Sequence, residues 1–278
     1  MIFCNAKLNL YLKILGKRDD GYHQLNMINV PVSFYDEMNI DIYPGDSKLV
    51  QNFRPELSCS YDKTTIYKAY MLLKTFIPEN ITIEVSVKKI IPEGAGMGGG
   101  SSNAAFFINE LVKRFNIKLT EELISKIAFQ VGADVPFFIY NKPAFLEGIG
   151  ERVFPYRAFP TLNLLVIKPD FSVNTKWAYS LVKCYSQPDD FNKDIMTQKE
   201  LLTIMTNDLE KPVEEKYFEI KKIKNFLYNN DALKAMMTGS GSSVFGIFKS
   251  CNDLDRAYLK AEKTFLNYKV IKAKTIGA

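Results

Sequence analysis

Residues 6–14 alternate strictly between apolar and polar side chains, which is the pattern of a β-strand. One face of this strand is entirely apolar, and the other carries Lys7, Asn9, Tyr11 and Lys13. The side chains of Lys7 and Asn9 therefore point the same way. The same alternation predicts strands at 28–34, 38–43 and 81–87, after a turn-rich loop at 16–25.

Apolar residues with helical spacing predict helices at 64–76, 104–115 and 121–130, the last capped by Thr120. Glycines at 148–150 predict a tight hairpin. Prolines cluster near 154–160, and we place the boundary between two domains there, giving residues 1–157 and 158–278. In the second domain we expect a strand at 161–169, one long charged helix at 206–230, a turn and strand at 236–248, and a final helix and strand at 253–276.

Residues 91–105 read IPEGAGMGGGSSNAA and hold five of the chain's fifteen glycines: Gly94, Gly96, Gly98, Gly99 and Gly100. Glycine permits a positive φ and leaves backbone N–H groups free to approach an anion. Ser101, Ser102 and Asn103 follow as helix-opening residues. We call residues 94–102 the glycine loop and interpret it as a phosphate cradle at a helix N-terminus.

Three other interpretations of this loop were weighed. Residues 94–99 match the dinucleotide fingerprint G-x-G-x-x-G, but a second helix follows where that fold needs a strand. A Walker loop requires a Lys-Ser or Lys-Thr pair after the glycines, and none is present. A flexible linker would not be flanked by Pro92 and a helix cap.

Composition narrows the class of protein further. At 278 residues, with 47% hydrophobic and 24% charged residues, the chain is long enough for one large or two ordinary domains, and we expect a cytoplasmic protein without a membrane span. Its four cysteines form no C-x-x-C pair and His23 is the only histidine, so a zinc site and a disulfide framework are not expected. The net charge of +5 is modest and its lysines are dispersed, which suits anionic small molecules at least as well as nucleic acid. We expect small-molecule partners and no nucleic acid.

Several motifs occur in an order that resembles the kinase superfamily of galactokinase, homoserine kinase, mevalonate kinase and phosphomevalonate kinase. They are AKLNLYLKILGKRDDGYHQL, IPEGAGMGGGSSNAA, VGADVPFF, EGIGE and MTGSGSSVF, which span residues 6–245. The G-Y-H and G-A-D-V-P motifs resemble those of one branch of this superfamily, the kinases that phosphorylate a cytidylated sugar alcohol in the non-mevalonate isoprenoid pathway. The resemblance implies a two-lobed α+β fold: an ATP-binding lobe with the glycine loop, a ferredoxin-like C-terminal lobe, and ATP and substrate meeting between them.

The resemblance also implies the roles of individual residues. Asp134 would take the proton of the substrate 2-hydroxyl, and Lys7 would be its electrostatic partner. The glycine loop, with Pro92 and Met97, would hold the phosphates of ATP; Mg²⁺ would bridge them, within reach of Ser101 or Ser102. Without the resemblance, Lys7 reads as part of a solvated strand face and Asp134 as a turn or helix-terminal residue.

For the cytidylated substrate, the resemblance implies a base platform. Tyr22 and Tyr179 would sandwich the cytosine while His23 bonds its edge. The remaining residues expected near the substrate are Asn9, Lys13, Thr175 and Gly239.

The chain departs from the family pattern at two places. Met97 replaces the usual leucine of the loop, which is a tolerable apolar exchange. Asp62-Lys63-Thr64-Thr65 replaces the usual D-N-L, so Thr64 offers one hydroxyl where an amide would offer more hydrogen bonds. Adenine selectivity is then expected to rest on Lys89 and on backbone groups.

Two alternative functions remain at this point. A sibling kinase acting on homoserine or a mevalonate derivative would not use Tyr22 and His23 as a base platform. A catalytically silent nucleotide-binding or RNA-binding module would not need both Lys7 and Asp134. We expect a monomer or a homodimer.

Overall fold

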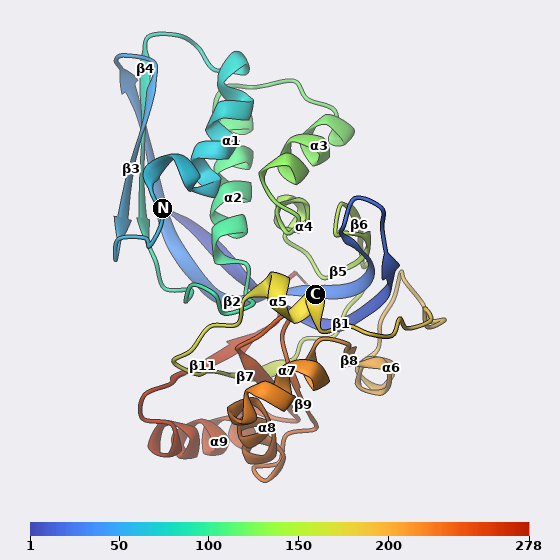
Figure 1. Cartoon of the computed structure of the whole chain (residues 1–278). Helices are drawn as coiled ribbons and strands as arrows, with labels where there is room; N and C mark the ends of the chain where they lie inside the picture. The colour runs from blue at the N-terminus through green and yellow to red at the C-terminus, as the bar shows by residue number, and fades with distance from the viewer. Residues whose placement is uncertain (278) are drawn as a thin grey trace. The chain divides into compact units, whose positions relative to one another are not determined.

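The computed structural model of the protein describes residues 1–277. Its strands, in chain order, are β1 (Ile2–Lys17), β2 (His23–Pro44), β3 (Lys48–Arg54), β4 (Ile81–Lys88), β5 (Ala144–Gly148), β6 (Arg152–Pro155), β7 (Asn163–Lys168), β8 (Thr206–Asn207), β9 (Lys234–Met237), β10 (Val244–Phe248) and β11 (Lys269–Lys274) (Figure 1). Its helices are α1 (Thr65–Leu73), α2 (Gly99–Arg114), α3 (Glu121–Val131), α4 (Val135–Tyr140), α5 (Thr175–Ser180), α6 (Gln198–Ile204), α7 (Glu210–Lys216), α8 (Phe218–Tyr228) and α9 (Cys251–Thr264), with short 3₁₀ helices at Tyr61–Lys63 and Lys74–Phe76.

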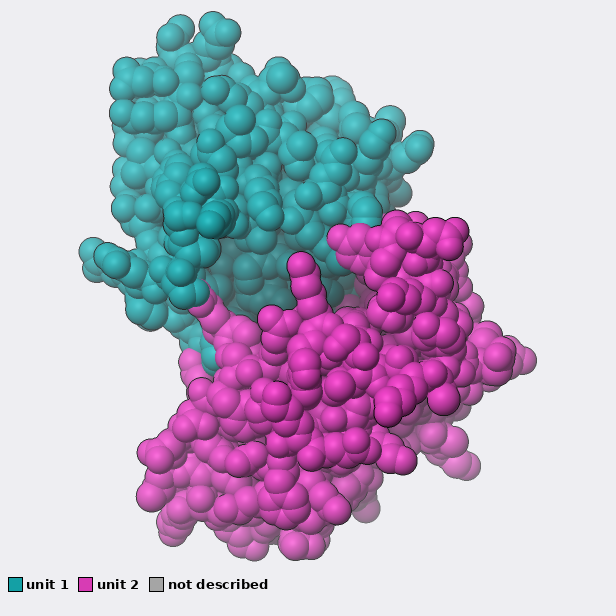
Figure 2. All heavy atoms as spheres, viewed as in Figure 1, with its two compact units in different colours: residues 1–6, 34–92, 98–141 teal, residues 7–33, 93–97, 142–278 magenta. Residues whose placement is uncertain are grey.

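The chain forms two compact units, coloured separately in Figure 2. Unit 1 comprises residues 1–6, 34–92 and 98–141, and unit 2 comprises residues 7–33, 93–97 and 142–278. The predicted boundary after residue 157 divides the chain once, whereas each compact unit gathers several segments. That boundary therefore stays a prediction.

Unit 1 combines a small sheet with four packed helices. The last part of β2 pairs antiparallel with β4, which pairs parallel with β3 on its other side. Helix α2 packs against α1, α3 and α4. Its apolar residues Ala104, Phe107, Ile108 and Leu111 recur at helical spacing and are all fully buried. This buried stripe fixes the position of the N-terminus of α2, where the glycine loop ends.

Unit 2 contains an antiparallel sheet in the order β11-β7-β10-β9. Helix α8 packs on β9 and β10, and α9 packs on β7, β10 and β11. The four strands and the two helices that pack on them follow one another along the chain as β7-α8-β9-β10-α9-β11, with α5, α6, β8 and α7 inserted between β7 and α8. This β-α-β-β-α-β order is the ferredoxin-like arrangement predicted for the C-terminal lobe. Strand β1 lies beside β2 and pairs parallel with β8, while β5 pairs with the first part of β2 and forms a hairpin with β6.

The local predictions are largely confirmed, with three differences. The strand runs at 28–34 and 38–43 form one continuous strand, β2, which begins at His23 inside the predicted loop. The predicted helix at 206–230 is wrong, because residues 206–207 pair with β1 and the helical part breaks into α7 and α8 at Tyr217 (φ −114°, ψ 82°). Helix α2 begins at Gly99, before the serines that were expected to open it.

Candidate active site

The end of the glycine loop forms the N-terminus of α2. Gly98 is the N-cap residue, with a φ of 70° that favours glycine. The N–H of Ser102 donates to the carbonyl of Gly98 at 2.9 Å, so the N–H groups of Gly99, Gly100 and Ser101 come before the first hydrogen bond of the helix. These three N–H groups and the helix dipole make this end of α2 suited to a phosphate group.

The start of the glycine loop packs on backbone within unit 2. Gly94 and Gly96 have φ values of 61° and 72°. A Cβ atom on Gly96 would lie 2.5 Å from the carbonyl oxygen of Thr238 and 3.0 Å from that of Gly241. The loop can approach residues 238–241, which we call the T-G-S-G turn, only because residue 96 has no side chain.

Lys7 and Asn9 lie beside these segments in unit 2. The N–H of Lys7 donates to the carbonyl of Met97 at 3.0 Å, and its ammonium donates to Oδ1 of Asn9 at 2.5 Å. Asn9 in turn donates from Nδ2 to Oδ1 of Asn29 at 2.6 Å. Lys7 is only 4% exposed, so the alternative of a solvated strand face is excluded. The contact between Lys7 and Asn9 confirms that the two side chains share a face of β1.

The T-G-S-G turn is held in place by side chains from distant parts of the sequence. Nδ2 of Asn207 donates to the carbonyls of Met237 and Gly239, both at 2.8 Å. A Cβ atom on Gly239 would lie 3.0 Å from Oδ1 of Asn9 and 3.8 Å from Nζ of Lys7. Unit 2 therefore brings together Lys7, Asn9 and the first part of the glycine loop around this turn.

Thr175 joins the same cluster at the start of α5. Its hydroxyl lies 3.0 Å from the hydroxyl of Ser240 in the T-G-S-G turn. Asn174 caps this short helix by accepting a hydrogen bond from the N–H of Trp177. The predicted substrate residues Asn9, Thr175 and Gly239 thus belong to one neighbourhood of unit 2.

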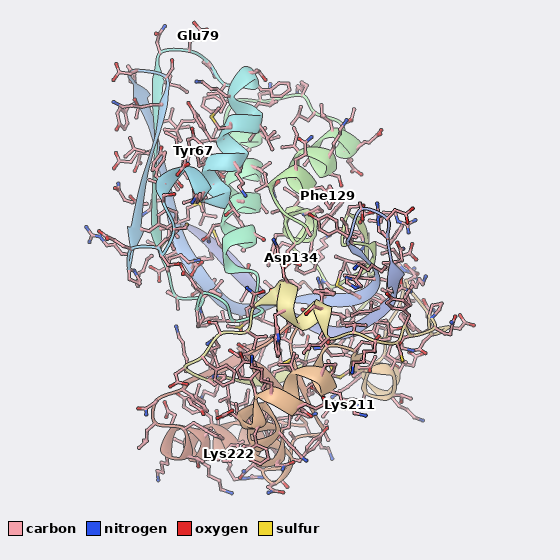
Figure 3. The ribbon with its side chains drawn as sticks, in the orientation of Figure 1. Tyr67, Glu79, Phe129, Asp134, Lys211 and Lys222 are labelled. Carbon is pink, nitrogen blue, oxygen red and sulfur yellow. The ribbon has the colours of Figure 1, made fainter. Side chains whose placement is uncertain are left out.

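Asp134 is the N-cap residue of α4 in unit 1 and is half-buried (Figure 3). Its side chain makes no capping hydrogen bond to the helix, although aspartate is a favoured capping residue. Pro136 in the first turn of α4 fixes the backbone just after Asp134. The carboxylate therefore stands at a rigid helix start without serving as its cap.

The side chains of Thr64 and Lys89, both expected near ATP, are engaged in other contacts. The hydroxyl of Thr64 caps α1 by accepting from the N–H of Tyr67 at 3.0 Å, and it donates to Gln51 at 2.8 Å. The ammonium of Lys89 is paired with the carboxylate of Asp36. The roles of Thr64 and Lys89 at the adenine stay predictions.

The proposed base platform is partly assembled. The rings of His23 and Tyr179 are stacked, with centroids 5.1 Å apart and planes inclined by 27°. Tyr22 is 59% exposed, and within residues 1–277 no ring is stacked on it. Burial, followed by the positive charge of Lys17, holds the pKa of His23 below its usual value of 6.5. The imidazole is therefore neutral at physiological pH, with one donor and one acceptor nitrogen.

Lys13, expected near the substrate diphosphate, forms an ion pair with Asp189 at 2.6 Å and donates to the carbonyl of Gln187 at 3.0 Å. Asp189 belongs to the segment after α5 that sequence patterns did not assign to any element. The negative charge of Asp189 offsets the positive charge of Lys13. The contact of Lys13 with a diphosphate therefore stays a prediction.

The sequence analysis missed two residues that hold backbone of the site in place. Asp36 accepts hydrogen bonds from the backbone just before the glycine loop, and Asn207 donates to the backbone of the T-G-S-G turn and the residue before it. Both lie in short polar stretches, and their hydrogen-bond partners are remote in sequence. Within residues 1–277, no cluster of three or more His, Cys, Asp or Glu side chains could hold a metal ion. Over the same residues, no helix has the length and apolar character needed to span a membrane.

Comparisons with known proteins agree with this geometry. The family model described as "GHMP kinases N terminal domain" matches residues 64–142, and "GHMP kinases C terminal" matches residues 189–267. A 4-diphosphocytidyl-2-C-methyl-D-erythritol kinase of Bacteroides fragilis is 40% identical over 252 residues, covering 88% of this chain and 91% of the relative.

Solved structures show the same relationship. A crystal structure of 4-(cytidine 5'-diphospho)-2C-methyl-D-erythritol kinase superposes with a TM-score of 0.80 and 27% identity, covering 99% of this chain and 98% of the other. A homoserine kinase from Cytophaga hutchinsonii superposes with a TM-score of 0.68 at 15% identity, covering 97% of this chain and 94% of the other. The second likeness concerns the fold alone.

Proposed function

We propose that the chain, which belongs to the GHMP kinase family, transfers the γ-phosphoryl group of ATP to the 2-hydroxyl of 4-diphosphocytidyl-2-C-methyl-D-erythritol. This reaction is a step of the non-mevalonate route to isoprenoid precursors. The structural observation that carries the proposal is the cluster in unit 2, where the glycine loop and the T-G-S-G turn meet beside the buried ammonium of Lys7.

Lys7 stabilises the negative charge of the transferring phosphoryl group. Its ammonium is buried and oriented by Asn9, whose own amide is held by Asn29. A cation in such a desolvated, preorganised setting acts more strongly on developing charge than one in water. The glycine loop contributes the N–H groups at the start of α2 to the phosphates.

Asp134 accepts the proton of the 2-hydroxyl as phosphoryl transfer proceeds. Its position supports this role, because Asp134 is half-buried at the start of α4, where Pro136 in the first turn fixes the backbone. Lys7 belongs to unit 2 and Asp134 to unit 1.

Mg²⁺ accompanies ATP in this proposal, and one residue offers a suitable ligand atom. The hydroxyl of Ser102 is fully buried and has no hydrogen-bond partner among residues 1–277. A hydroxyl in the first turn after a phosphate-binding loop suits Mg²⁺, which takes few protein ligands beside the phosphate oxygens. When bound, the ion neutralises charge on the phosphates; Ser102 and Ser101 would hold it from the protein side.

The stacked rings of His23 and Tyr179 support recognition of the cytidine. The cytosine stacks against this pair of rings or on the exposed ring of Tyr22. A neutral imidazole can donate to and accept from the pyrimidine edge.

The proposal is tested by ATP-dependent ADP release with three alcohols: the cytidylated methylerythritol, homoserine and mevalonate. We expect release only with the first. Turnover with homoserine or mevalonate instead would establish the sibling-kinase alternative. ATP binding without turnover on any of the three would establish the silent binding module.

A further inference from the structure

One carboxylate in unit 1 accepts four hydrogen bonds from groups on either side of the glycine loop. Asp36 lies in β2 and is completely buried. Its Oδ1 accepts from the N–H groups of Ile90 at 2.6 Å and Ile91 at 2.8 Å. Its Oδ2 accepts from the ammonium of Lys89 and from Nδ2 of Asn103 at 3.0 Å.

These donors stand at the two ends of the glycine loop. Residues 89–91 lead from β4 toward the loop, and Asn103 follows the loop directly in α2. Lys89 also donates to Oδ1 of Asn103 at 2.9 Å, which closes a ring of three side chains. A single carboxylate therefore ties the entry of the loop to its exit.

The link between the two ends of the loop depends on the negative charge of the Asp36 carboxylate, which balances the positive charge of Lys89. Asp36 and Lys89 form the ion pair, and the side chain of Lys89 is only 8% exposed. The neighbouring thiol of Cys4 adds no charge, because burial raises its pKa to about 12. A buried ion pair is weak evidence of added stability, since apolar residues of similar volume often serve as well. The directions of its hydrogen bonds are what apolar residues cannot supply.

We propose that Asp36 is a positioning residue for ATP, which sets the separation of the two ends of the glycine loop and with it the aim of the N–H groups at the start of α2. The same contacts fix the ammonium of Lys89. The inference rests on the proposed function, since it assigns Asp36 to the phosphate-binding part of that site. Asp36 acts through the loop and touches no reacting atom.

The test replaces Asp36 by asparagine, which keeps the volume and removes the charge. Whichever way the amide turns, its NH₂ group faces two of the four donors, so one end of the loop loses its acceptor. We expect the Kd for ATP to rise by about 10- to 100-fold, the range for losing hydrogen bonds to a charged group. The Kd for the cytidylated substrate should stay within about twofold of wild type.

Two control variants separate this role from general loss of stability. Glu37→Gln neutralises the next carboxylate on β2, which is half-buried and pairs with the exposed Lys88 at 3.2 Å, and should leave the Kd for ATP unchanged. Val85→Ala removes buried methyl groups from β4 and should lower Tm without a selective loss of ATP affinity. Should Asp36→Asn fail to fold, Asn103→Ala removes only the α2 end of the tie and should still raise the Kd for ATP.

Calorimetric titration with each ligand, beside a thermal melt of every variant, gives the decisive comparison. A selective rise of the Kd for ATP in Asp36→Asn or Asn103→Ala supports the positioning role. Unchanged ATP binding in a folded Asp36→Asn variant would overturn it, as would equal losses of affinity for both ligands. A wild-type protein that binds no ATP would instead refute the proposed function itself.

Discussion

Replacing Gly96 by alanine tests whether the glycine loop works through close packing of backbone on backbone. The new Cβ atom would lie 2.5 Å from the carbonyl oxygen of Thr238 and 3.0 Å from that of Gly241. Both obstacles are backbone atoms, so no side-chain rotation relieves the overlap. The residue also has a φ of 72°, which an L-residue rarely adopts.

The expected cost follows from these two effects. Holding a residue with a Cβ atom in the left-handed region costs roughly 1–2 kcal/mol. Overpacking against fixed neighbours costs about 1–3 kcal/mol more. The combined penalty of about 2–5 kcal/mol divides between lower stability, if the loop keeps its place, and lost ATP affinity, if it moves. If the whole penalty appears as lost ATP affinity, its lower limit of about 2 kcal/mol corresponds to a rise of about 30-fold in the Kd for ATP.

The measurement is the Kd for ATP by calorimetry together with Tm. Gly16→Ala is the matched control, because nothing lies within 4 Å of a Cβ atom at that position and its φ is not in the left-handed region. We expect Gly16→Ala to resemble wild type in both quantities. A Gly96→Ala variant with wild-type Tm and wild-type Kd for ATP would refute the packing argument.

Three further predictions concern the catalytic and base-binding residues. Asp134→Asn should bind both ligands but lower kcat by about 10²- to 10⁴-fold, the usual effect of losing a general base; near-native turnover would exclude that role. Tyr179→Ala should weaken the cytidylated substrate by about 1–3 kcal/mol while leaving the Kd for ATP unchanged, and losses confined to ATP would reverse the two pockets. The lowered pKa of His23 means that the unfolded chain binds the extra proton first, so this residue makes stability decline as pH falls below about 6.5. Urea titrations from pH 7.5 to 5 should show a smaller decline for His23→Gln, and identical curves would contradict the assignment.

Features governed by local pattern could be predicted from the sequence. The alternation at residues 6–14 identified β1, and the spacing of Ala104, Phe107, Ile108 and Leu111 identified α2, because each pattern reflects a face that the element buries. The glycine-rich turn at 148–150 likewise forms the predicted hairpin between β5 and β6. The ferredoxin-like arrangement came from the family resemblance.

Features that depend on remote partners could not be predicted. Asp36 lies between two predicted strand runs, and nothing local marks it. Its carboxylate is nevertheless buried and accepts hydrogen bonds from Ile91 and Asn103, which are 55 and 67 residues away. The start of α2 was misplaced because Gly99 and Gly100 are poor helix formers, and a buried stripe further along the helix outweighs their propensity. The break between α7 and α8 at Tyr217 could not be predicted, because neither proline nor glycine occurs there.

The hydrogen bond from the N–H of Asn9 to the hydroxyl of Thr238, at 2.9 Å, spans 229 residues of sequence. During synthesis, the segment bearing Lys7 leaves the ribosome well before the turn that completes its surroundings. A nascent chain that has not reached residues 238–241 therefore lacks the acceptor and the glycines that order this cluster, however well unit 1 has formed. Closing so long a loop is entropically expensive, which makes this neighbourhood a late event in folding. A chain that stops before residue 238 would then form helix α2 without completing the cluster around Lys7.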